Sequence, residues 1–355
     1  MMMHCDNTML NEKIAQIQSL LKKQNLDYLI IGNFGHQVRD DLLYYLLLEH
    51  LELGVMIIPK KGTPILHSIS FETEQLQKAY PALKVVPISS ELYVLPKDHE
   101  KKRIAYRPSS MPKKYVQRRF VAFCDEETVM AIKAPKEIAF LKKAAQITDT
   151  IFSNVVTHWK QFKTEQDVAT YIVMKTIELG AEPSFPPIVA SGRRAANPHH
   201  HPEAKALLKG FCVIDMGIRY QGYCSDMTRT IYIGKPSKKE GEIYDHLRRV
   251  QEEAIEECLI GKKISDIAKN CRTRLGEEWN RHFTHALGHG LGTQVHEWPR
   301  VSTSVQEPLQ ENMYITIEPG VYPPGKFGIR IEDDVLITKH GPVVLTKTSK
   351  KLIIV

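Results

Sequence analysis

Four acidic residues in apolar, strand-like stretches are the side chains of this sequence best placed to bind metal ions. The segments 211–218 and 223–234 carry Asp215 and Asp226, and a turn centred just after Tyr220 predicts that the two aspartates face each other across a hairpin. Their Cβ atoms would then lie about 5 Å apart. Two carboxylates at that separation repel each other unless a cation lies between them, so this hairpin predicts a metal ion.

A second hairpin repeats the arrangement with two glutamates. A loop centred on Gly325 places Glu318 opposite Glu332, each in an apolar, β-rich run. An unpaired buried charge there would be strongly destabilising. The alternative interpretation, acidic side chains exposed on an edge strand, fits Asp333 and Asp334 better than Glu332, and the apolar alternation leaves open which way this strand faces.

Three histidines follow one another closely between the two hairpins. His285 and His289 have the spacing of a zinc-binding pair on a helix, and His296 comes one short segment later. However, glycine occupies every second position from Gly288 to Gly292, which argues against a regular helix and for a close approach of two backbones. A lone histidine is usually structural, but beside four paired acids one of these three is expected to be a metal ligand.

This set of residue types predicts a metal centre. Four carboxylates and one imidazole form a hard, oxygen-rich site, which suits two divalent ions such as manganese or cobalt, with zinc as an alternative. Two ions about 3.5–4 Å apart can bridge a water molecule and lower its pKa.

The first part of the chain has the pattern of an α/β unit. Apolar spacing predicts a helix over 14–21 and a buried strand over 28–31. The segments 54–59 and 65–69 are predicted to form a hairpin. This unit ends near Val129, and nothing within it resembles a phosphate loop, a nucleophile elbow or a metal cluster.

The second part of the chain must position the residues described above. A long periodic segment predicts a helix from Pro135 to Val155, with proline in its first turn. Two further helices are predicted over 164–179 and 240–257. The strand and turn segments between and after these helices hold nearly all the residues that are candidates for metal binding or catalysis.

Length and composition indicate a soluble globular protein of two domains. The chain has 355 residues, of which 43% are hydrophobic and 25% charged, which excludes a disordered or collagen-like chain. The formal net charge is +7, and the stretch from Lys97 to Arg119, with nine basic and two acidic residues, accounts for all of it. Pro108 and Pro112 punctuate this stretch, and no aromatic stacking pattern accompanies it, so a solvated surface is favoured over a nucleic-acid site.

Targeting signals and cysteine usage favour the cytoplasm. The first ten residues lack a secretory signal, and the longest apolar run, Leu42 to Leu48, is far shorter than a membrane span. The six cysteines show no CxxC spacing, which favours reduced thiols.

Four motifs together resemble a known family, the pita-bread metallopeptidases, and within it the proline-specific branch of aminopeptidase P and prolidase. The motifs are DMG…SDMTRT, HALGHGLG…HEWP, ITIEPGVY and GIRIEDD, and the resemblance extends from Ala131 to the C-terminus. It implies a two-metal centre whose ligands are Asp215, Asp226, His289, Glu318 and Glu332.

The resemblance also implies a metal-bridging hydroxide as the nucleophile that attacks the peptide carbonyl, with no covalent enzyme intermediate. It further implies roles for residues around the metals. Glu318 would act as general base and then general acid. His199 and His296 would lie near the scissile carbonyl, although the run from His199 to His201 leaves open which histidine faces the site. Three further residues would orient the substrate or support the metal ligands: His285, Arg330 and Tyr322. For His285 and Tyr322, purely structural roles are equally open.

The fold implied is a two-domain α/β protein. Residues 1–129 would form a smaller creatinase-like α/β domain, and residues 130–355 a pita-bread α+β catalytic domain with a curved antiparallel sheet. The stretch from Asp40 to Tyr45 lacks the usual Thr-Gly-Phe pattern of the first domain. In the family this domain helps to build a dimer, which implies a homodimer here, without nucleic-acid or membrane partners.

Several functions stay open within this resemblance. The leading one is an Xaa-Pro aminopeptidase that cleaves before a proline in second position, and the alternative is an Xaa-Pro dipeptidase restricted to dipeptides. A creatinase-like amidinohydrolase is disfavoured because creatinases do not carry the five metal ligands. A non-catalytic peptide- or nucleic-acid-binding relative is expected to have degraded ligands, and here all five residue types are intact.

Overall fold

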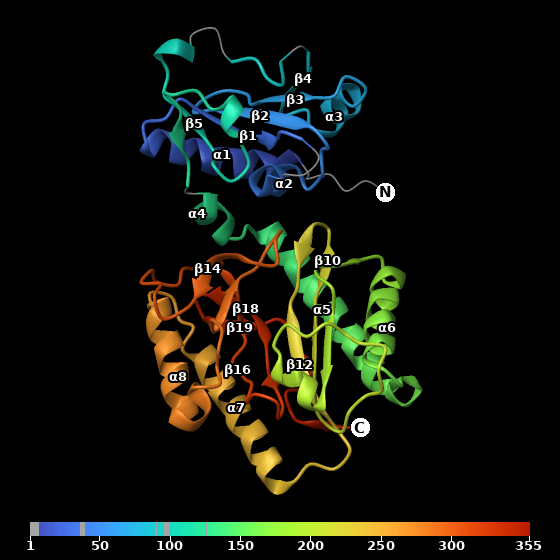
Figure 1. The fold of residues 1–355 in the computed structure, drawn as a ribbon. Helices are drawn as coiled ribbons and strands as arrows, with labels where there is room; N and C mark the ends of the chain where they lie inside the picture. The colour runs from blue at the N-terminus through green and yellow to red at the C-terminus, as the bar shows by residue number, and fades with distance from the viewer. Residues whose placement is uncertain (1–6, 36–39, 90, 96–98, 125) are drawn as a thin grey trace. The chain divides into compact units, whose positions relative to one another are not determined.

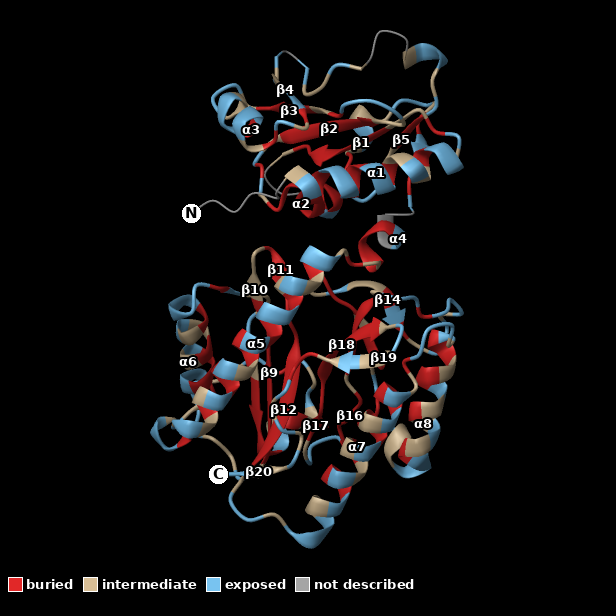
Figure 2. Ribbon diagram, turned by 180° about the vertical axis from the view of Figure 1, so that it is seen from behind, coloured by how far each residue is buried: buried red, intermediate tan, exposed pale blue. Residues whose placement is uncertain are grey.

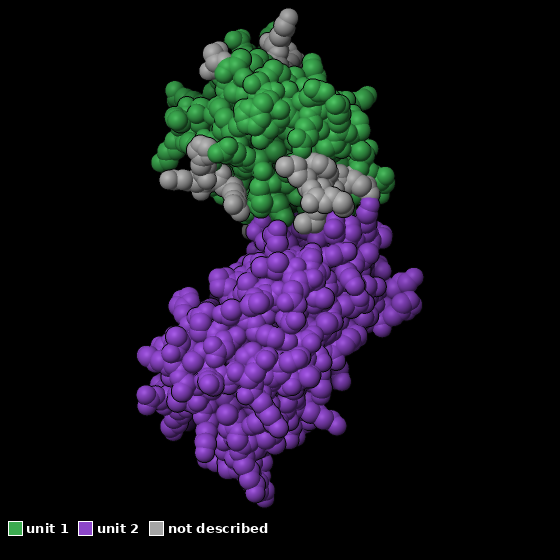
Figure 3. All heavy atoms as spheres, turned by 90° about the vertical axis from the view of Figure 1, so that its right-hand side faces the viewer, with its two compact units in different colours: residues 1–130 green, residues 131–355 purple. Residues whose placement is uncertain are grey.

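The computed structural model describes residues 7–35, 40–89, 91–95, 99–124 and 126–355. The chain divides into two compact units, Met1–Met130 and Ala131–Val355, which Figure 3 colours green and purple. Each unit is described separately. None of the described helices is long and apolar enough to cross a membrane.

Residues 1–130 form a six-stranded mixed sheet with the strand order β4-β3-β2-β1-β5-β6 (Figure 1). The predicted helix, strand and hairpin of this unit are confirmed, with β2 and β3 paired antiparallel. The strands are β1 Tyr28–Asn33, β2 Gly54–Pro59, β3 Ile65–Ser68, β4 Lys84–Pro87, β5 Ile104–Tyr106 and β6 Val121–Ala122. The helices are α1 Asn7–Lys23, α2 Asp41–Leu47, α3 Thr73–Ala79 and α4 Glu126–Ala131, with 3-10 turns at His99–Lys101 and Lys113–Tyr115.

The basic stretch is only partly the solvated surface that its composition predicts. Lys113, Lys114 and Arg118 are exposed. Arg107 is buried and forms an ion pair of 2.8 Å with Asp40, so the prediction is wrong for this residue. A buried guanidinium needs such a partner because desolvation of an unpaired charge is costly. Lys97 lies outside the described residues.

Four helices of residues 131–355 pack in pairs against two different sheets. The helices are α5 Pro135–Thr157, α6 Glu165–Glu178, α7 Lys238–Glu256 and α8 Ile264–Asn280, with 3-10 turns at Trp159–Gln161 and Gly192–Ala196. The first pair shares a core with the sheet β20-β12-β9-β8, and the second pair shares a core with the sheet β14-β13-β15-β18-β19. Figure 2 shows the outward faces of these helices exposed and the central strands β9, β12 and β18 buried.

The strands of this unit are short and mostly antiparallel. Two small sheets, β11-β10-β7 and β16-β17, accompany the two larger ones. The strands are β7 Glu182–Pro183, β8 Ile188–Ser191, β9 Gly210–Met216, β10 Ile218–Tyr220, β11 Tyr223–Cys224, β12 Met227–Ile233, β13 Gly288–Gly290, β14 Glu297–Val301, β15 Tyr314–Ile317, β16 Gly320–Val321, β17 Ile329–Arg330, β18 Asp333–Thr338, β19 Gly341–Val344 and β20 Ile353–Ile354.

Local sequence signals begin the predicted helices where the structure has them. Pro135 is the first residue of α5, where its missing N–H has no intrahelical partner to lose. Thr164 caps α6, because its side chain accepts from the backbone N–H of Asp167 while the carboxylate of Asp167 accepts from the backbone N–H of Thr164. The predicted helices over 135–155, 164–179 and 240–257 are therefore confirmed, each within a few residues.

The first hairpin differs from its predicted register. The strands turn at Gln221 and Gly222, both of which have positive φ angles (50° and 81°), as a two-residue type I′ turn requires. Asp215 consequently pairs with Thr228 and not with Asp226. Moving the turn by one residue moves the cross-strand partner by two, so both aspartates still belong to the same face, as diagonal neighbours.

The second hairpin has the predicted register. Ile317 pairs with Asp333 in one ladder and Gly320 pairs with Arg330 in the next, and both pairings follow from a loop centred on Gly325. The glutamates Glu318 and Glu332 lie opposite each other in the gap between these ladders. The interpretation of Asp333 and Asp334 as exposed acids is wrong, because both are fully buried.

Candidate metal centre

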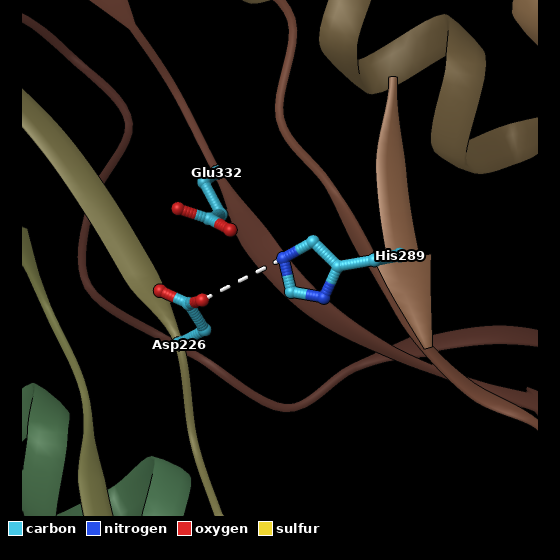
Figure 4. Close-up of side chains that lie close together, drawn as sticks. All are labelled: Asp226, His289 and Glu332. Carbon is cyan, nitrogen blue, oxygen red and sulfur yellow. Dashed lines mark ion pairs between the residues drawn. The ribbon is translucent and has the colours of Figure 1, made fainter. Parts of the chain in front are cut away.

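Three side chains that can bind a metal converge in residues 131–355. Asp226 immediately precedes β12, His289 is the central residue of β13, and Glu332 immediately precedes β18. Each offers one ligand atom, and these atoms lie within 4.8 Å of one another. In Figure 4 both carboxylates point toward the imidazole. Three residues from separate segments of the chain thus form one compact group.

The two other predicted ligands lie beside this group. Glu318 directly follows β15, and its Oε1 is 3.4 Å from Nε2 of His289. Asp215 lies in β9, close enough that its charge helps to raise the pKa of Asp226, Glu318 and Glu332. The structure therefore brings all five together, and their role as ligands is a proposal taken up below.

Hydrogen bonding orients the imidazole of His289 toward the carboxylates. Its Nδ1 lies 3.0 Å from the carbonyl oxygen of Gly290 and donates to it. Burial and the neighbouring His296 lower the pKa of His289 to about 4, so the ring is neutral at pH 7 and Nε2 carries a lone pair. This lone pair faces Oε1 of Glu318 and, at 3.7 Å, Oδ2 of Asp226. A histidine that gives one N–H to a carbonyl and turns the other nitrogen inward has the usual arrangement of a metal ligand.

The carboxylates around His289 resist ionisation in the absence of a cation. Burial, followed by the charges of neighbouring acids, raises the pKa of Asp226 and Glu332 well above the usual range. Burial raises the pKa of Glu318 to about 8. Among the described residues, Oδ1 of Asp215 and Oδ1 of Asp226 are buried without a hydrogen-bond partner. Unpaired acceptors and a lone pair directed at oxygen atoms fit hard divalent cations, which would satisfy all of them.

Two glycines allow the strand of His289 to approach its neighbours. A methyl group at Gly288 would collide with the carbonyl oxygen of Thr316 in β15, and one at Gly290 would collide with the carbonyl of Trp298 in β14. The backbone N–H of His289 donates to Oγ1 of Thr316 over 3.1 Å. The predicted close approach of two backbones is therefore confirmed, and it places His289 between the two flanking strands.

A chain of hydrogen bonds supports the opposite side of the cluster. Arg330 donates to Oδ2 of Asp215 at 2.5 Å and to the hydroxyl of Tyr322 at 2.7 Å. The hydroxyl of Tyr322 lies 3.1 Å from Nε2 of His285, whose Nδ1 is 2.8 Å from the carbonyl oxygen of Ala286. Burial, assisted by the charge of Arg330, lowers the pKa of His285 to about 3. The ring is therefore neutral, and its Nε2 accepts a hydrogen bond from the hydroxyl of Tyr322.

The remaining predicted histidines lie at the open side of the cluster. The ring of His296 meets that of His289 edge to face, with centroids 4.4 Å apart. Burial lowers the pKa of His296, and His199 contributes to the lowered pKa of both His285 and His296. His199 itself is exposed. The structure thus brings His199 and His296 to the same region, next to His285.

His200, by contrast, points away into a structural contact. It is buried, and its Nε2 lies 2.8 Å from Oε2 of Glu165 at the start of α6. His201 is exposed. Of the three consecutive histidines, His199 is the one whose charge acts on the pKa of His285 and of His296.

Sequence reasoning missed a buried network behind the cluster. Arg229 donates to the carbonyl oxygen of Glu332 and, over 2.6 Å, to the carboxylate of Asp333. Lys350 forms a second ion pair with Asp333 at 3.1 Å, and Thr228 donates to the carboxylate of Glu332 at 2.6 Å. An arginine inside an apolar strand was the available signal, because such a residue requires an acidic partner. The identity of that partner, about 100 residues away, was not readable locally.

Comparison with known families agrees with this geometry. The model of metallopeptidase family M24 matches residues 139–339, which is more than half of the chain. The chain belongs to metallopeptidase family M24. The resemblance to the pita-bread metallopeptidases and the corresponding two-domain α/β fold class are thereby confirmed.

Relatives within family M24 carry names of proline-specific peptidases. An Xaa-Pro dipeptidase of Pyrococcus horikoshii is 43% identical over 227 residues, which are 62% of this chain and 64% of that protein. The match thus spans just under two thirds of this curated relative. The solved structure of Xaa-Pro dipeptidase from Bacillus anthracis has a TM-score of 0.88 and 29% identity, covering 98% of this chain and 100% of that one. An X-Pro aminopeptidase structure from Thermotoga maritima has a TM-score of 0.82 and 28% identity, covering 93% and 98%.

Proposed function

We propose that this M24 protein is a metal-dependent peptidase that hydrolyses the bond before a proline in second position. The observation that carries the proposal is the neutral imidazole of His289, whose lone pair faces the carboxyl groups of Asp226 and Glu318, with Oδ1 of Asp226 buried and without a hydrogen-bond partner. The names of the Pyrococcus and Bacillus relatives support the proline specificity. The same names favour the dipeptidase over the aminopeptidase. The aminopeptidase was the leading expectation from the sequence. The Thermotoga neighbour keeps the aminopeptidase as the second candidate.

Five residues would hold two divalent ions, with manganese or cobalt preferred and zinc as an alternative: Asp215, Asp226, His289, Glu318 and Glu332. Such ions supply Lewis-acid polarisation of the peptide carbonyl and the means to activate a water molecule. The donor set of one imidazole and four carboxylates supports hard ions over the thiolate-rich sites of structural zinc.

The protein side chains would supply proton transfer and orientation. Glu318 takes a proton from the attacking water and returns it to the proline nitrogen, a role supported by its position beside His289, with Oε1 3.4 Å from Nε2 of that ring. His296 and His199 donate hydrogen bonds to the oxygen of the scissile carbonyl as negative charge develops on it. Arg330, Tyr322 and His285 keep Asp215 and the substrate pocket in place through their chain of hydrogen bonds.

A cleavage panel tests this function. We expect the chelated, dialysed protein to be inactive and to regain hydrolysis of Ala-Pro when manganese or cobalt is added. Hydrolysis of Ala-Pro-Ala-Ala as well would identify the aminopeptidase, and Met-Ala-Ala and creatine serve as controls that should stay intact. Asp226→Asn should remove metal-dependent turnover while the protein stays folded. Activity that survives exhaustive chelation would refute the metal-dependent mechanism.

The assembly and location of the protein belong to the same proposal. We propose a cytoplasmic homodimer with no nucleic-acid or membrane partner, residues 1–129 being a creatinase-like accessory domain. The balanced charge outside the stretch from Lys97 to Arg119 supports the absence of a nucleic-acid partner. Light scattering of the purified protein would measure the oligomeric state directly.

A further inference from the structure

A single buried carboxylate, that of Glu165, accepts hydrogen bonds from the segment 191–203, which carries His199. Glu165 is the first residue of α6 and has no exposed surface. Its Oε1 accepts hydrogen bonds from the backbone N–H and the hydroxyl of Ser191, at 2.8 and 2.7 Å, and from Arg194 at 3.1 Å. Its Oε2 accepts from Nε2 of His200 at 2.8 Å and from the backbone N–H of Glu203 at 3.3 Å. All these donors lie within residues 191–203.

The carboxylate of Glu165 is ionised, which makes these bonds strong. Burial acts to raise the pKa of Glu165, but the hydrogen bonds from Ser191, His200 and Arg194 outweigh it and hold the pKa below its usual value. Hydrogen bonds to a charged acceptor are about twice as strong as neutral ones. The helix that carries Glu165 is itself anchored, since its apolar face contributes Val168 and Ile172 to a buried core. Segment 191–203 is thus fastened to a rigid element.

The other side of the same segment touches the metal centre. The carbonyl oxygen of Pro198 accepts a hydrogen bond of 3.4 Å from Arg330, which also binds Asp215. His199 follows Pro198 directly, and its neighbour His200 is the residue held by Glu165. These two contacts hold the backbone on both sides of His199, and so the position from which its exposed side chain extends.

We propose that Glu165 is a positioning residue for His199, acting through His200 and the backbone of segment 191–203. This inference rests on the proposed function, in which His199 contacts the substrate. Glu165 lies outside the set of metal-binding candidates and binds none of them. It should therefore affect the use of His199 and leave the binding of metal unchanged.

A double-mutant cycle separates positioning from general stability. We would compare Glu165→Gln, His199→Ala and the double variant in kcat and KM for Ala-Pro at saturating manganese. Glu165→Gln should lower kcat/KM up to about 100-fold, as expected for a misplaced catalytic group. The double variant should fall within about two-fold of His199→Ala alone, because the two residues act as one unit. Glu257→Gln removes a comparable acidic partner of Arg274 and Asn270 far from the cluster and should leave both kinetic constants unchanged.

Two measurements do not depend on turnover. Manganese affinity by calorimetry should be the same for Glu165→Gln and the wild type. The NMR signal of the His199 ring, assigned by its loss in His199→Ala, should shift in Glu165→Gln. If Glu165→Gln does not fold, His200→Gln and Arg194→Gln can replace it, since each changes one donor to the Glu165 carboxylate. Each should show a smaller loss of kcat/KM that is coupled to His199→Ala in the same way.

The outcomes distinguish the two levels of the proposal. Multiplicative losses in the double variant, a parallel loss of manganese affinity, or an unchanged His199 signal would overturn the role of Glu165. A wild-type protein that cleaves none of the Xaa-Pro substrates would overturn the proposed function instead, and the NMR comparison would still decide whether Glu165 positions His199.

Discussion

At the scale of single residues, protonation of the acids decides when the cluster can accept a cation. The pKa of Glu318 is raised by burial to about 8, and those of Asp226 and Glu332 are raised well above normal by burial and by neighbouring acids. His289 is neutral at any pH above about 4. A divalent ion must therefore displace carboxyl protons but no imidazole proton in the range near neutrality.

The affinity for manganese should consequently rise as the pH rises from 5 to 8. The sign follows from the raised carboxyl pKa values, because protons on the acids compete with the metal at low pH, and Glu318, whose pKa is raised by burial to about 8, is increasingly ionised towards the upper end of this range. Calorimetry at several pH values, in buffers of different ionisation enthalpy, would measure both the affinity and the protons released. Asp226→Asn is the control and should bind metal more weakly at every pH. An affinity that stays constant over this range would contradict the prediction.

At the scale of elements, the metal centre depends on how closely three strands approach. β13 lies between β14 and β15, and Gly288 leaves no room for a side chain beside the carbonyl of Thr316. The strand must move if that space is filled, and His289 would move with it.

Gly288→Ala should therefore destabilise the protein by about 1–3 kcal/mol, the usual cost of overpacking, and should weaken manganese binding. Gly241→Ala is the matched control, because a methyl group at Gly241 in α7 meets no atom within 4 Å. This control should stabilise the protein by up to about 1 kcal/mol, since alanine is the better helix former. Urea unfolding and metal titration of both variants would measure the difference. Equal effects of the two substitutions would show that the close approach does not matter.

Short-range signals explain which elements were predictable. Pro135 and the Thr164 capping box mark helix starts that depend only on nearby residues. The register of the second hairpin was predictable because its loop is centred on Gly325. The first hairpin was misplaced by one residue because Gln221, which adopts a positive φ, carries no signal of its own.

Long-range packing explains what could not be predicted. Helix α8 was missed, and Gly276 within it has a non-helical φ of 73° that interrupts the helical pattern. Asp333 was interpreted as exposed because its partners, Arg229 and Lys350, belong to other segments of the chain. The four acids were found from the spacing of the two hairpins, and His289 was selected among three histidines by the family resemblance, whereas their common location follows from pairing between distant strands.

At the scale of the whole molecule, the two units have separate cores. Residues 1–130 contain a core around Ile30, Val55 and Ile104. Residues 131–355 contain their own cores and all the candidate metal-binding residues. A ligand that binds only the folded form of one unit stabilises that unit selectively.

Scanning calorimetry should therefore resolve two unfolding transitions, and manganese should raise only one of them. The affected transition should be that of residues 131–355, and Asp226→Asn should reduce the shift. Limited proteolysis before and after heating through the first transition would assign each transition to its unit. A single transition that moves as a whole with manganese would show instead that the two units unfold as one.

Glu318 and Glu332 lie in the gap between the two ladders of the second hairpin, so their backbone amides do not bond to each other's strand. These amides can therefore report when the cluster of metal-binding candidates opens. The amide of Glu318 donates to the carbonyl of Leu287 at 2.8 Å, and the amide of Glu332 donates to the carbonyl of Thr228 at 3.1 Å. These two N–H groups thus bond outside their own hairpin, to the segments that carry His289 and Asp226. Any motion that separates these segments exposes the two amides to solvent. Their deuterium uptake would therefore measure how often the cluster opens, without substrate and without a probe attached to the protein.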